Sequence, residues 1–525
     1  MPQPSPAPSV APPFSSSWRS DLPASLVVVF VALPLCLGIA LASGAPLTAG
    51  IVAGVIGGIV VGLLSTSQLM VSGPAAGLSA IVLAGITSLG SFQAFLAAVV
   101  IGGVLQTALG LLRAGVIGYY FPSTVIKGML AAIGVILILK QIPHAVGYDA
   151  DFVGDESFRQ ANDETTFTAL GDLAQQVQPG AVVIALLSLT VLILWAQPAF
   201  RRLKVVPAPL IVVLLGIGLN ALFARVWPEF AIRSTHLVSL PVTDRPSQWL
   251  TFFSMPDWSA ITSFTTWRLG VTIAIVASLE TLLSLEATDK MDPFKRQSDT
   301  NRELLAQGIG NTLAGLVGGL PVTGVIVRSA ANIDAGAQTR WSAIIHGGLL
   351  LVFVLAIPTV LNMIPLAALA AMLLYTGFKL ASPALFRTAW KLGWAQFIPF
   401  VVTVVAIVLT DLLVGIAIGL AIATFFILAQ YLRQDALRLV SPPGAILRRY
   451  QLPDQATFLS KANIGQTLNA LPDGSRVEID GGSTTRFDYD VIEQLYEFVE
   501  TARLRNIDYR LVNVPTALIT PTHKH

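Results

Sequence analysis

The chain has 525 residues, of which 54% are hydrophobic and only 12% are charged, and its formal net charge is +2. This composition excludes an ordinary water-soluble fold, because so few charged residues cannot cover the surface of such a chain. The small net charge and the lack of a Lys/Arg-rich block exclude nucleic-acid binding through the phosphate backbone. The single cysteine, Cys36, excludes an internal disulfide and a thiolate metal centre, and we expect no metal and no cofactor.

The N-terminal residues 1–17 are rich in Pro, Ser and Ala and contain no charged side chain and no long apolar run. They therefore differ from a secretory signal peptide, and we expect residues 1–20 to form a disordered cytoplasmic tail. Beyond them, most apolar residues fall in runs of roughly 17 to 24, the length of a helix that crosses a bilayer. Residues 21–436 are predicted to form an all-α polytopic membrane domain.

The apolar runs predict fourteen transmembrane segments, many of them separated only by Gly, Pro or Ser. Taken as two sets of seven, the segments would form two equivalent halves. The predicted segments are residues 25–43, 47–65, 74–90, 93–112, 121–140, 180–197, 206–223, 268–286, 303–319, 325–337, 342–360, 363–379, 393–411 and 412–431.

The Lys and Arg residues predict the orientation of these segments, because cytoplasmic loops are enriched in them. Basic residues follow the sixth, eighth, tenth and twelfth segments, whereas the loop after the fifth segment is acidic. We therefore expect both termini in the cytoplasm and a multi-pass protein of the cell inner (plasma) membrane. The basic residues concerned are Arg201, Arg202, Lys204, Lys290, Lys295, Arg296, Arg302, Arg340, Lys379, Arg387 and Lys391.

From about Leu437 the composition becomes that of a water-soluble α/β unit, which we predict to span residues 437–525. Residues 476–480 have the pattern of a strand, residues 488–505 that of an amphipathic helix, and residues 509–514 that of another strand. This unit carries no Walker motif, no His/Cys cluster and no nucleophile arrangement. The sequence does not predict an enzyme.

Gly and Pro interrupt two of the predicted membrane segments. The first break is Val71–Gly77, and the second is Gly318–Asn332, in which we expect a β-like stretch at Val325–Val327 and a short helix from about Arg328. In hydrocarbon such breaks occur where they line protein or a water-filled cavity, and they often build ion sites. They open the third and tenth segments, which are matching positions of the two halves. Two converging helix N-termini would favour an anion, and the alternative is close helix packing through small residues.

Two charged residues within the apolar segments, Arg328 and Glu280, are candidates for the site. Arg328 should have a cavity, a partner or a ligand, because a buried positive charge costs at least ~2.5 to 3.5 kcal/mol by insertion scales. It is the candidate for attracting the anion, and the alternative is a structural pairing with a carboxylate or with backbone carbonyls. Glu280 could take up a proton with the anion, or form a cation site with Ser284. The alternative role for Glu280 is structural, as a fixed ion pair with Arg328.

The residues resemble the SulP family of sulfate permeases and related anion transporters, in which a membrane domain precedes a cytoplasmic STAS domain. The resemblance covers nearly the whole chain. It depends on several motifs together, which are Asp21–Gly44 with Pro34, Val71–Gly77, Asn301–Asn311, Gly318–Gly324, Arg328–Asn332 and Ala335–Arg340.

The resemblance implies a seven-plus-seven inverted repeat like that of uracil transporters, divided into a core and a gate, with a core that moves as an elevator. It also implies a homodimer. The anion would lie between the third and tenth helices, and Glu280 and Ser284 of the eighth helix would hold a coupling ion. The implied anion-binding residues are Gly73, Pro74, Ala75, Ala76, Gly324, Val325, Ile326, Val327 and Arg328.

The chain departs from the family pattern at several positions. Relatives that couple bicarbonate to sodium carry Asp and Thr at the positions of Glu280 and Ser284, and Thr at those of Ala75 and Ile326. These departures favour proton coupling or exchange over sodium coupling. The segment 325–329 is most similar to members sometimes joined to carbonic anhydrase, which favours bicarbonate slightly over sulfate. In the STAS-like unit, the serines of the phosphorylation loop are replaced by Tyr489 and Asp490, so we expect no phosphorylation switch.

The sequence thus predicts a secondary active transporter of small inorganic anions, bicarbonate or sulfate, with chloride and dicarboxylates as further candidates. Three alternatives stay open at this point. One is an uncoupled anion channel of the same fold, which would not need a titrating Glu280. A second is a nucleobase transporter, which would need polar side chains in place of Val325–Val327. A third is a membrane sensor that signals through its terminal unit.

Overall fold

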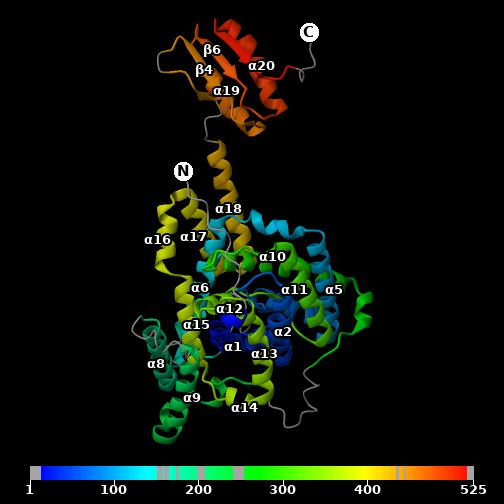
Figure 1. The fold of residues 1–525 in the computed structure, drawn as a ribbon, viewed down its shortest axis with the longest axis vertical. Helices are drawn as coiled ribbons and strands as arrows, with labels where there is room; N and C mark the ends of the chain where they lie inside the picture. Colours follow the sequence, from blue (N-terminus) through cyan, green and yellow to red (C-terminus); the bar gives the residue numbers. More distant parts are fainter. Residues whose placement is uncertain are drawn as a thin grey trace. The chain divides into compact units, whose positions relative to one another are not determined.

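The computed structural model describes residues 14–149, 158, 165–172, 177–197, 207–240, 253–432, 437–442 and 445–516. Met1–Ala423 and Thr424–His525 form two compact units, and each is described by itself. The first unit is almost entirely helical (Figure 1). The predicted boundary at residue 436 stays a prediction.

The helices of the first unit follow one another along the chain, broken by two three-residue strands, and the last helix, α18, crosses the boundary between the units. The strands are β1 (Ser72–Pro74) and β2 (Val322–Gly324). The helices are α1 (Phe14–Ala42), α2 (Leu47–Ile56), the π-helix η1 (Gly57–Val61), α3 (Gly62–Leu64), the 3₁₀ turn η2 (Ala76–Leu78), α4 (Ser79–Leu89), α5 (Phe92–Leu111), η3 (Ala114–Tyr120), α6 (Ser123–Val146), α7 (Thr166–Asp172), α8 (Pro179–Trp195), α9 (Ala208–Val226), η6 (Pro228–Phe230), η7 (Ser234–His236), η9 (Trp258–Thr262), α10 (Phe264–Met291), α11 (Thr300–Val317), α12 (Ile326–Asp334), α13 (Trp341–Ala356), α14 (Pro358–Leu361), α15 (Leu366–Leu380), α16 (Pro383–Lys391), α17 (Trp394–Leu409) and α18 (Leu412–Leu432).

The described residues contain eight helices that are long and apolar enough to cross a membrane, by length and composition. Four shorter apolar helices accompany them, at Ala76–Leu89, Pro179–Trp195, Trp341–Ala356 and Trp394–Leu409. The chain is therefore a multi-pass membrane protein. The expected fourteen spans in two halves of seven stay a prediction, because several predicted segments are short or broken helices.

The first helix begins earlier than the apolar pattern indicates. We expected residues 1–20 to be a disordered tail, but α1 starts at Phe14, while residues 1–13 lie outside the described residues. The reason is a polar anchor that hydropathy does not detect. The fully buried carboxylate of Asp21 accepts hydrogen bonds from the backbone N–H groups of Gln338 (2.8 Å) and Thr339 (3.1 Å), which lie between α12 and α13. These bonds hold the first turns of α1 against the domain.

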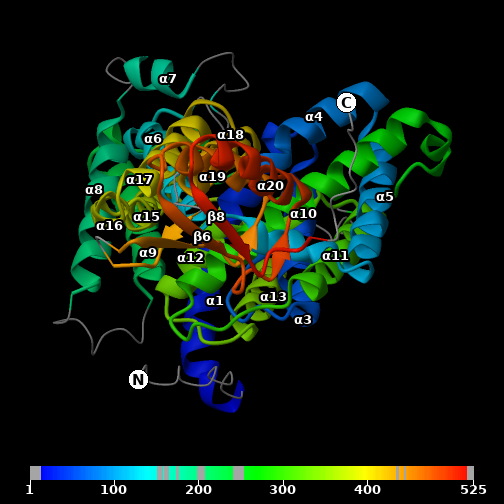
Figure 2. The same cartoon turned by 90° about the horizontal axis from the view of Figure 1, so that it is seen from above.

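Seen from above, the helices form two groups with α1 and α12 between them (Figure 2). In one group α5 packs along α10 and α11, and its buried core also includes residues of α2 and α4. In the other group α6 packs against α15 and α17, and α15 also packs against α8. α1 contacts α2, α12 and α13. The two breaks of the chain belong to the first group and to α12 beside it.

The second unit is a small α/β domain. Its four-stranded sheet has the order β3-β4-β6-β8, with β4, β6 and β8 parallel and β3 antiparallel to β4. The strand predicted at residues 476–480 and the helix predicted at residues 488–505 are confirmed as β6 and α20. The elements are β3 (Arg438–Leu439), β4 (Leu447–Gln451), β5 (Gln455–Ala456), η10 (Phe458–Ser460), α19 (Lys461–Asn469), β6 (Arg476–Asp480), β7 (Arg486–Phe487), α20 (Tyr489–Leu504) and β8 (Asp508–Val512).

α5 and α11 form a close helix contact beside the site. A Cβ atom added to Gly308 would lie 2.4 Å from the backbone nitrogen of Thr107, and one added to Gly103 would lie 2.3 Å from that of Thr312. Because backbone atoms on both helices are involved, a side-chain rotation cannot relieve either clash. These glycines allow α11 to lie against α5 (Figure 1).

We therefore expect Gly308→Ala to lower the midpoint of thermal unfolding in detergent, because the added methyl overpacks the contact by about 1 to 3 kcal/mol. Gly218→Ala in α9 is the matched control, since nothing lies within 4 Å of its added Cβ. Fluorescence-detected size-exclusion after heating measures both variants. Equal midpoints for the two variants would show that the α5–α11 contact is looser than described.

Candidate functional site

The two breaks predicted from the sequence lie side by side in the structure. β1 and β2 pair as an antiparallel ribbon in which Ser72 is opposite Gly324 and Pro74 is opposite Val322. All six strand residues are buried. Each strand leads into a helix, β1 through η2 into α4 and β2 into α12. The ribbon therefore places the starts of two interrupted helices next to each other.

The strand of the second break lies three residues earlier than expected. We expected a β-like stretch at Val325–Val327, but the strand is Val322–Gly324 and α12 already begins at Ile326. The partner decides the position, because β1 pairs with these residues alone. The N–H of Val325 donates to the Val71 carbonyl at 2.9 Å, and the carbonyl of Val325 accepts from Ser329 at 3.0 Å as the first helical bond.

The first break is a strand followed by a tight turn. Gly73 and Pro74 belong to β1, whereas Ala75 precedes the 3₁₀ turn that begins at Ala76. At Gly77 an added Cβ atom would lie 3.3 Å from both carboxylate oxygens of Glu280. Glu280 of α10 therefore lies against the start of this turn.

α10 also contacts the second break. Ser284 is 2% exposed, and its Cβ lies 3.3 Å from the position of a Cβ added to Gly324. The backbone N–H of Gly324 donates to the hydroxyl of Thr281 at 3.3 Å. The structure thus brings Glu280 and Ser284 together with both breaks, as the sequence predicts, and adds Thr281 as a third contact from the same helix.

Arg328 lies on α12, one turn after the strand, and its side chain is fully buried. Its Nη2 donates to the sulfur of Cys36 on α1 at 3.3 Å. An added Cβ on Gly73 would lie 2.1 Å from Arg328 Nη1, so the guanidinium packs on the backbone of β1. Within the described residues, Nε and Nη1 have no hydrogen-bond partner and the guanidinium has no ion pair.

The ion pairs of the described residues include none between Glu280 and Arg328. The alternative of a fixed ion pair between these two side chains is therefore wrong. The guanidinium faces Cys36. His346 of α13 is also buried, and its two ring nitrogens lack a partner in the described part of the chain. Glu280 instead faces Gly77. The two charged side chains therefore contact different residues of the first break.

Sequence reasoning missed three buried polar residues of α11 that hold the ribbon in place. Asn311 binds both backbone groups of Val322, accepting from its N–H (2.5 Å) and donating to its carbonyl (2.9 Å). Gln307 donates to the hydroxyl of Ser72 at 2.6 Å and to Glu303 at 3.0 Å. Glu303, Gln307 and Asn311 are spaced four residues apart, which places them on one face of a helix. That spacing within an apolar segment is the signal that would have found them.

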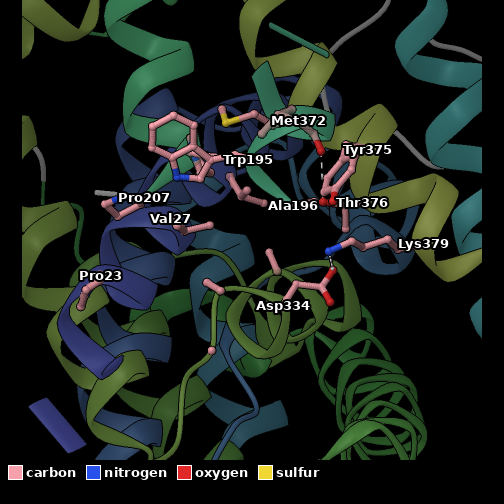
Figure 3. Close-up of a pocket in the computed structure, with 17 residues that line it drawn as sticks. Pro23, Val27, Trp195, Ala196, Pro207, Asp334, Met372, Tyr375, Thr376 and Lys379 are labelled. Carbon is pink, nitrogen blue, oxygen red and sulfur yellow. Dashed lines mark hydrogen bonds and ion pairs between the residues drawn. The ribbon is translucent and has the colours of Figure 1, made fainter. Parts of the chain in front are cut away.

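A cavity lies at the C-terminal end of α12, away from the strand that precedes this helix (Figure 3). It has a volume of about 390 Å³ and is formed by α1, α8, α12, α15 and the start of α9. Lys379 of α15 forms an ion pair with Asp334 at 3.2 Å on its wall, and the ammonium lies 4.6 Å from the ring centroid of Tyr375. None of the predicted anion-binding or coupling residues lines it.

The fold and the ribbon define a polytopic helical membrane protein whose broken helices meet inside the domain. The sequence model of the Sulfate permease family matches residues 18–406 of the chain. The chain therefore belongs to this family.

Two curated relatives illustrate the family. The chain is 29% identical over 373 residues to the putative sulfate transporter YvdB of Bacillus subtilis, covering 70% of this chain and 66% of the relative. It is 28% identical over 326 residues to the bicarbonate transporter BicA of Synechocystis, covering 62% and 53%. The chain thus spans less than two thirds of the length of either relative.

Solved structures establish the same fold. The transmembrane domain of a cyanobacterium bicarbonate transporter BicA superposes with a TM-score of 0.52 at 24% identity, covering 79% of this chain and 98% of that one. The murine Slc26a9 anion transporter in the inward-facing state gives a TM-score of 0.65 at 15% identity, covering 97% and 87%.

The contact between Gly73, Arg328 and Cys36 can be tested directly, because Cys36 is the only cysteine of the chain. We expect Cys36 to react slowly with a maleimide in the wild type, since it is fully buried. Gly73→Ala should increase the labelling rate several-fold, because the methyl displaces the guanidinium from the thiol. Gly348→Ala in α13 should leave the rate unchanged, as its added Cβ meets nothing within 4 Å. Equal labelling of both variants would contradict the packing described.

Proposed function

We propose that this protein is a secondary active transporter of small inorganic anions, with bicarbonate and sulfate as the leading substrates and chloride or dicarboxylates as further candidates. The observation that carries the proposal is Arg328, a fully buried guanidinium with two unpartnered nitrogens and no carboxylate partner among the described residues. Sulfate and bicarbonate are the anions in the names of two relatives.

Removing a charge from water costs several kcal/mol after relaxation, unless an opposite charge and hydrogen bonds compensate it. Cys36, the one described hydrogen-bond partner of Arg328, is a weak acceptor. A small anion at Nε or Nη1 would supply both the negative charge and the acceptors. An arginine provides several donors in a fixed plane, which suits the oxygens of sulfate or bicarbonate.

The proposed site lies between the starts of the two broken helices, taken as the third and tenth of fourteen in a seven-plus-seven inverted repeat. On the third helix it uses Gly73–Ala76, and on the tenth it uses Gly324–Arg328. The β1–β2 pairing supports this arrangement, because it brings both sets together. Glycine, alanine and proline leave room for an ion to approach backbone N–H groups, which carry partial positive charge at a helix start.

The proposed mechanism is elevator-type alternating access. The group of α5, α10 and α11, with the ribbon and α12, would form the moving core, and the group of α6, α8, α15 and α17 would form the gate. The cavity between α12 and α15 supports this division, because it separates the helix that carries Arg328 from the gate (Figure 3).

Glu280 with Ser284 is the proposed coupling site. Both side chains are buried beside the two breaks, so binding of a proton or sodium there would alter the field at the anion. We further propose a homodimer in the cell inner (plasma) membrane with cytoplasmic N- and C-termini. The STAS-like unit would then lie in the cytoplasm.

The direct test of the proposal is uptake of labelled bicarbonate and sulfate into proteoliposomes. We expect Arg328→Ala to lower the initial rate at least tenfold, about 1.4 kcal/mol, because it removes the buried positive charge. Arg328→Lys should retain part of the rate, since it keeps a charge but not the planar donors. Arg387→Ala in α16 is the matched control, because Arg387 is exposed. Full uptake by Arg328→Ala would remove this residue from the site.

Coupling is tested by imposing proton and sodium gradients on the same vesicles. If Glu280 is the coupling residue, Glu280→Gln should abolish accumulation against an anion gradient while anion exchange continues, because a neutral amide cannot titrate. Wild-type uptake that responds to neither gradient, together with an unchanged Glu280→Gln variant, would instead favour the uncoupled channel.

A further inference from the structure

Glu303 is a buried carboxylate that the proposed transport mechanism does not use. It lies in the first turns of α11 and is 0% exposed. The Ser65 hydroxyl donates to one of its oxygens, and Gln307 Nε2 donates to the other at 3.0 Å. Across the described residues no Lys, Arg or His forms an ion pair with it.

The surroundings of Glu303 offer little compensation for a negative charge. The neighbouring elements α2, η1, α3, α5 and β2 contain no Asp, Glu, Lys, Arg or His, and the tyrosines of η3 are exposed. The charged group of α10 that acts on Glu303 is Asp289, another acid, which accepts from Ser298 N (2.7 Å) and Oγ (2.8 Å).

Two arginines come close to this region but bind backbone instead of Glu303. Arg302 donates to the Leu64 carbonyl and Arg340 to the Ser65 carbonyl, each at 3.2 Å. A buried carboxylate without a cation, and with a second acid nearby, is much easier to accommodate when it holds a proton. Glu303 is therefore suited to exist in two charge states.

Gln307 connects Glu303 to the ribbon. Its Nε2 donates both to Glu303 and to the hydroxyl of Ser72 in β1 at 2.6 Å, while its Oε1 lacks a partner among the described residues. Ser72 is directly opposite Gly324 of β2. When Glu303 is ionised, the amide must present N–H groups to it. When Glu303 is protonated, the amide can turn and accept its O–H, which also changes the bond offered to Ser72.

We propose that Glu303 is a proton-binding site that controls anion affinity at the β1–β2 ribbon through Gln307 and Ser72. The inference rests on the proposed anion transport and adds a second titrating position, separate from Glu280. The proton comes from water and binds one carboxylate oxygen, and no other bond forms or breaks. Ionised Glu303 opposes a nearby anion, and protonated Glu303 does not. By linkage, proton binding and anion binding then strengthen each other.

The test measures the half-saturation constant of anion exchange in proteoliposomes across about pH 5 to 9. Labelled sulfate is the probe, with labelled chloride if sulfate is not carried, because both keep their charge over this range whereas bicarbonate titrates. We expect the wild-type constant to rise about tenfold toward alkaline pH. Glu303→Gln should hold it at the low, acidic value at every pH, because the amide mimics the protonated acid. Glu286→Gln is the matched control and should follow the wild type.

A second variant keeps the test decisive if Glu303→Gln does not fold. Asp289→Asn removes the neighbouring acid, so ionised Glu303 becomes easier to form and the rise in the constant should move to lower pH. A purely structural Glu303 would leave the profile in place in both variants.

The proposal is overturned if Glu303→Gln and Asp289→Asn keep the wild-type profile, or if Glu280→Gln alone abolishes it. Wild-type exchange without any pH dependence would reject Glu303 and leave anion transport intact, whereas a wild type that carries neither anion would reject both.

Discussion

Backbone hydrogen bonding at the two breaks is the constraint on which the rest of this structure depends. Inside a membrane protein an interrupted helix exposes N–H and C=O groups that water does not reach, and each unsatisfied group costs several kcal/mol. Pairing β1 with β2 satisfies the two breaks with each other. The same pairing places two helix starts side by side, so the solution to a folding problem also creates the surroundings that an anion prefers.

The polar face of α11 extends this principle. The Asn311 side chain binds the backbone N–H and C=O of Val322 as a neighbouring strand would, and Gln307 donates to the hydroxyl of Ser72 in β1. One helix therefore holds both strands of the ribbon. Gly103 and Gly308 allow α11 to pack closely against α5, and this contact holds α11 in position. The site is thus built on packed helices instead of loops, and a change in one carboxylate on α11 reaches the ribbon through a single amide.

The sequence predicts what depends on local chemistry. Gly, Pro and hydropathy were sufficient for the membrane domain and the two breaks, because each of these features leaves its own residues in the chain. The predicted position of the second strand was wrong. Val325–Val327 has the stronger β preference, but pairing with β1 determines which residues form the strand. The start of α1 was wrong because a buried Asp21 anchors it. Partners far apart in the chain, such as Arg328 and Cys36, required the fold.

The central claim is that an anion is the missing partner of the buried Arg328. A crystal structure of the protein with selenate, an analogue of sulfate, tests this claim most directly, because selenium can be located by its anomalous X-ray scattering. The account predicts selenate within hydrogen-bond distance of Arg328 Nε or Nη1, next to the β1–β2 ribbon. Selenate bound only at Lys379 or on the surface, with Arg328 in contact with protein alone, would contradict it.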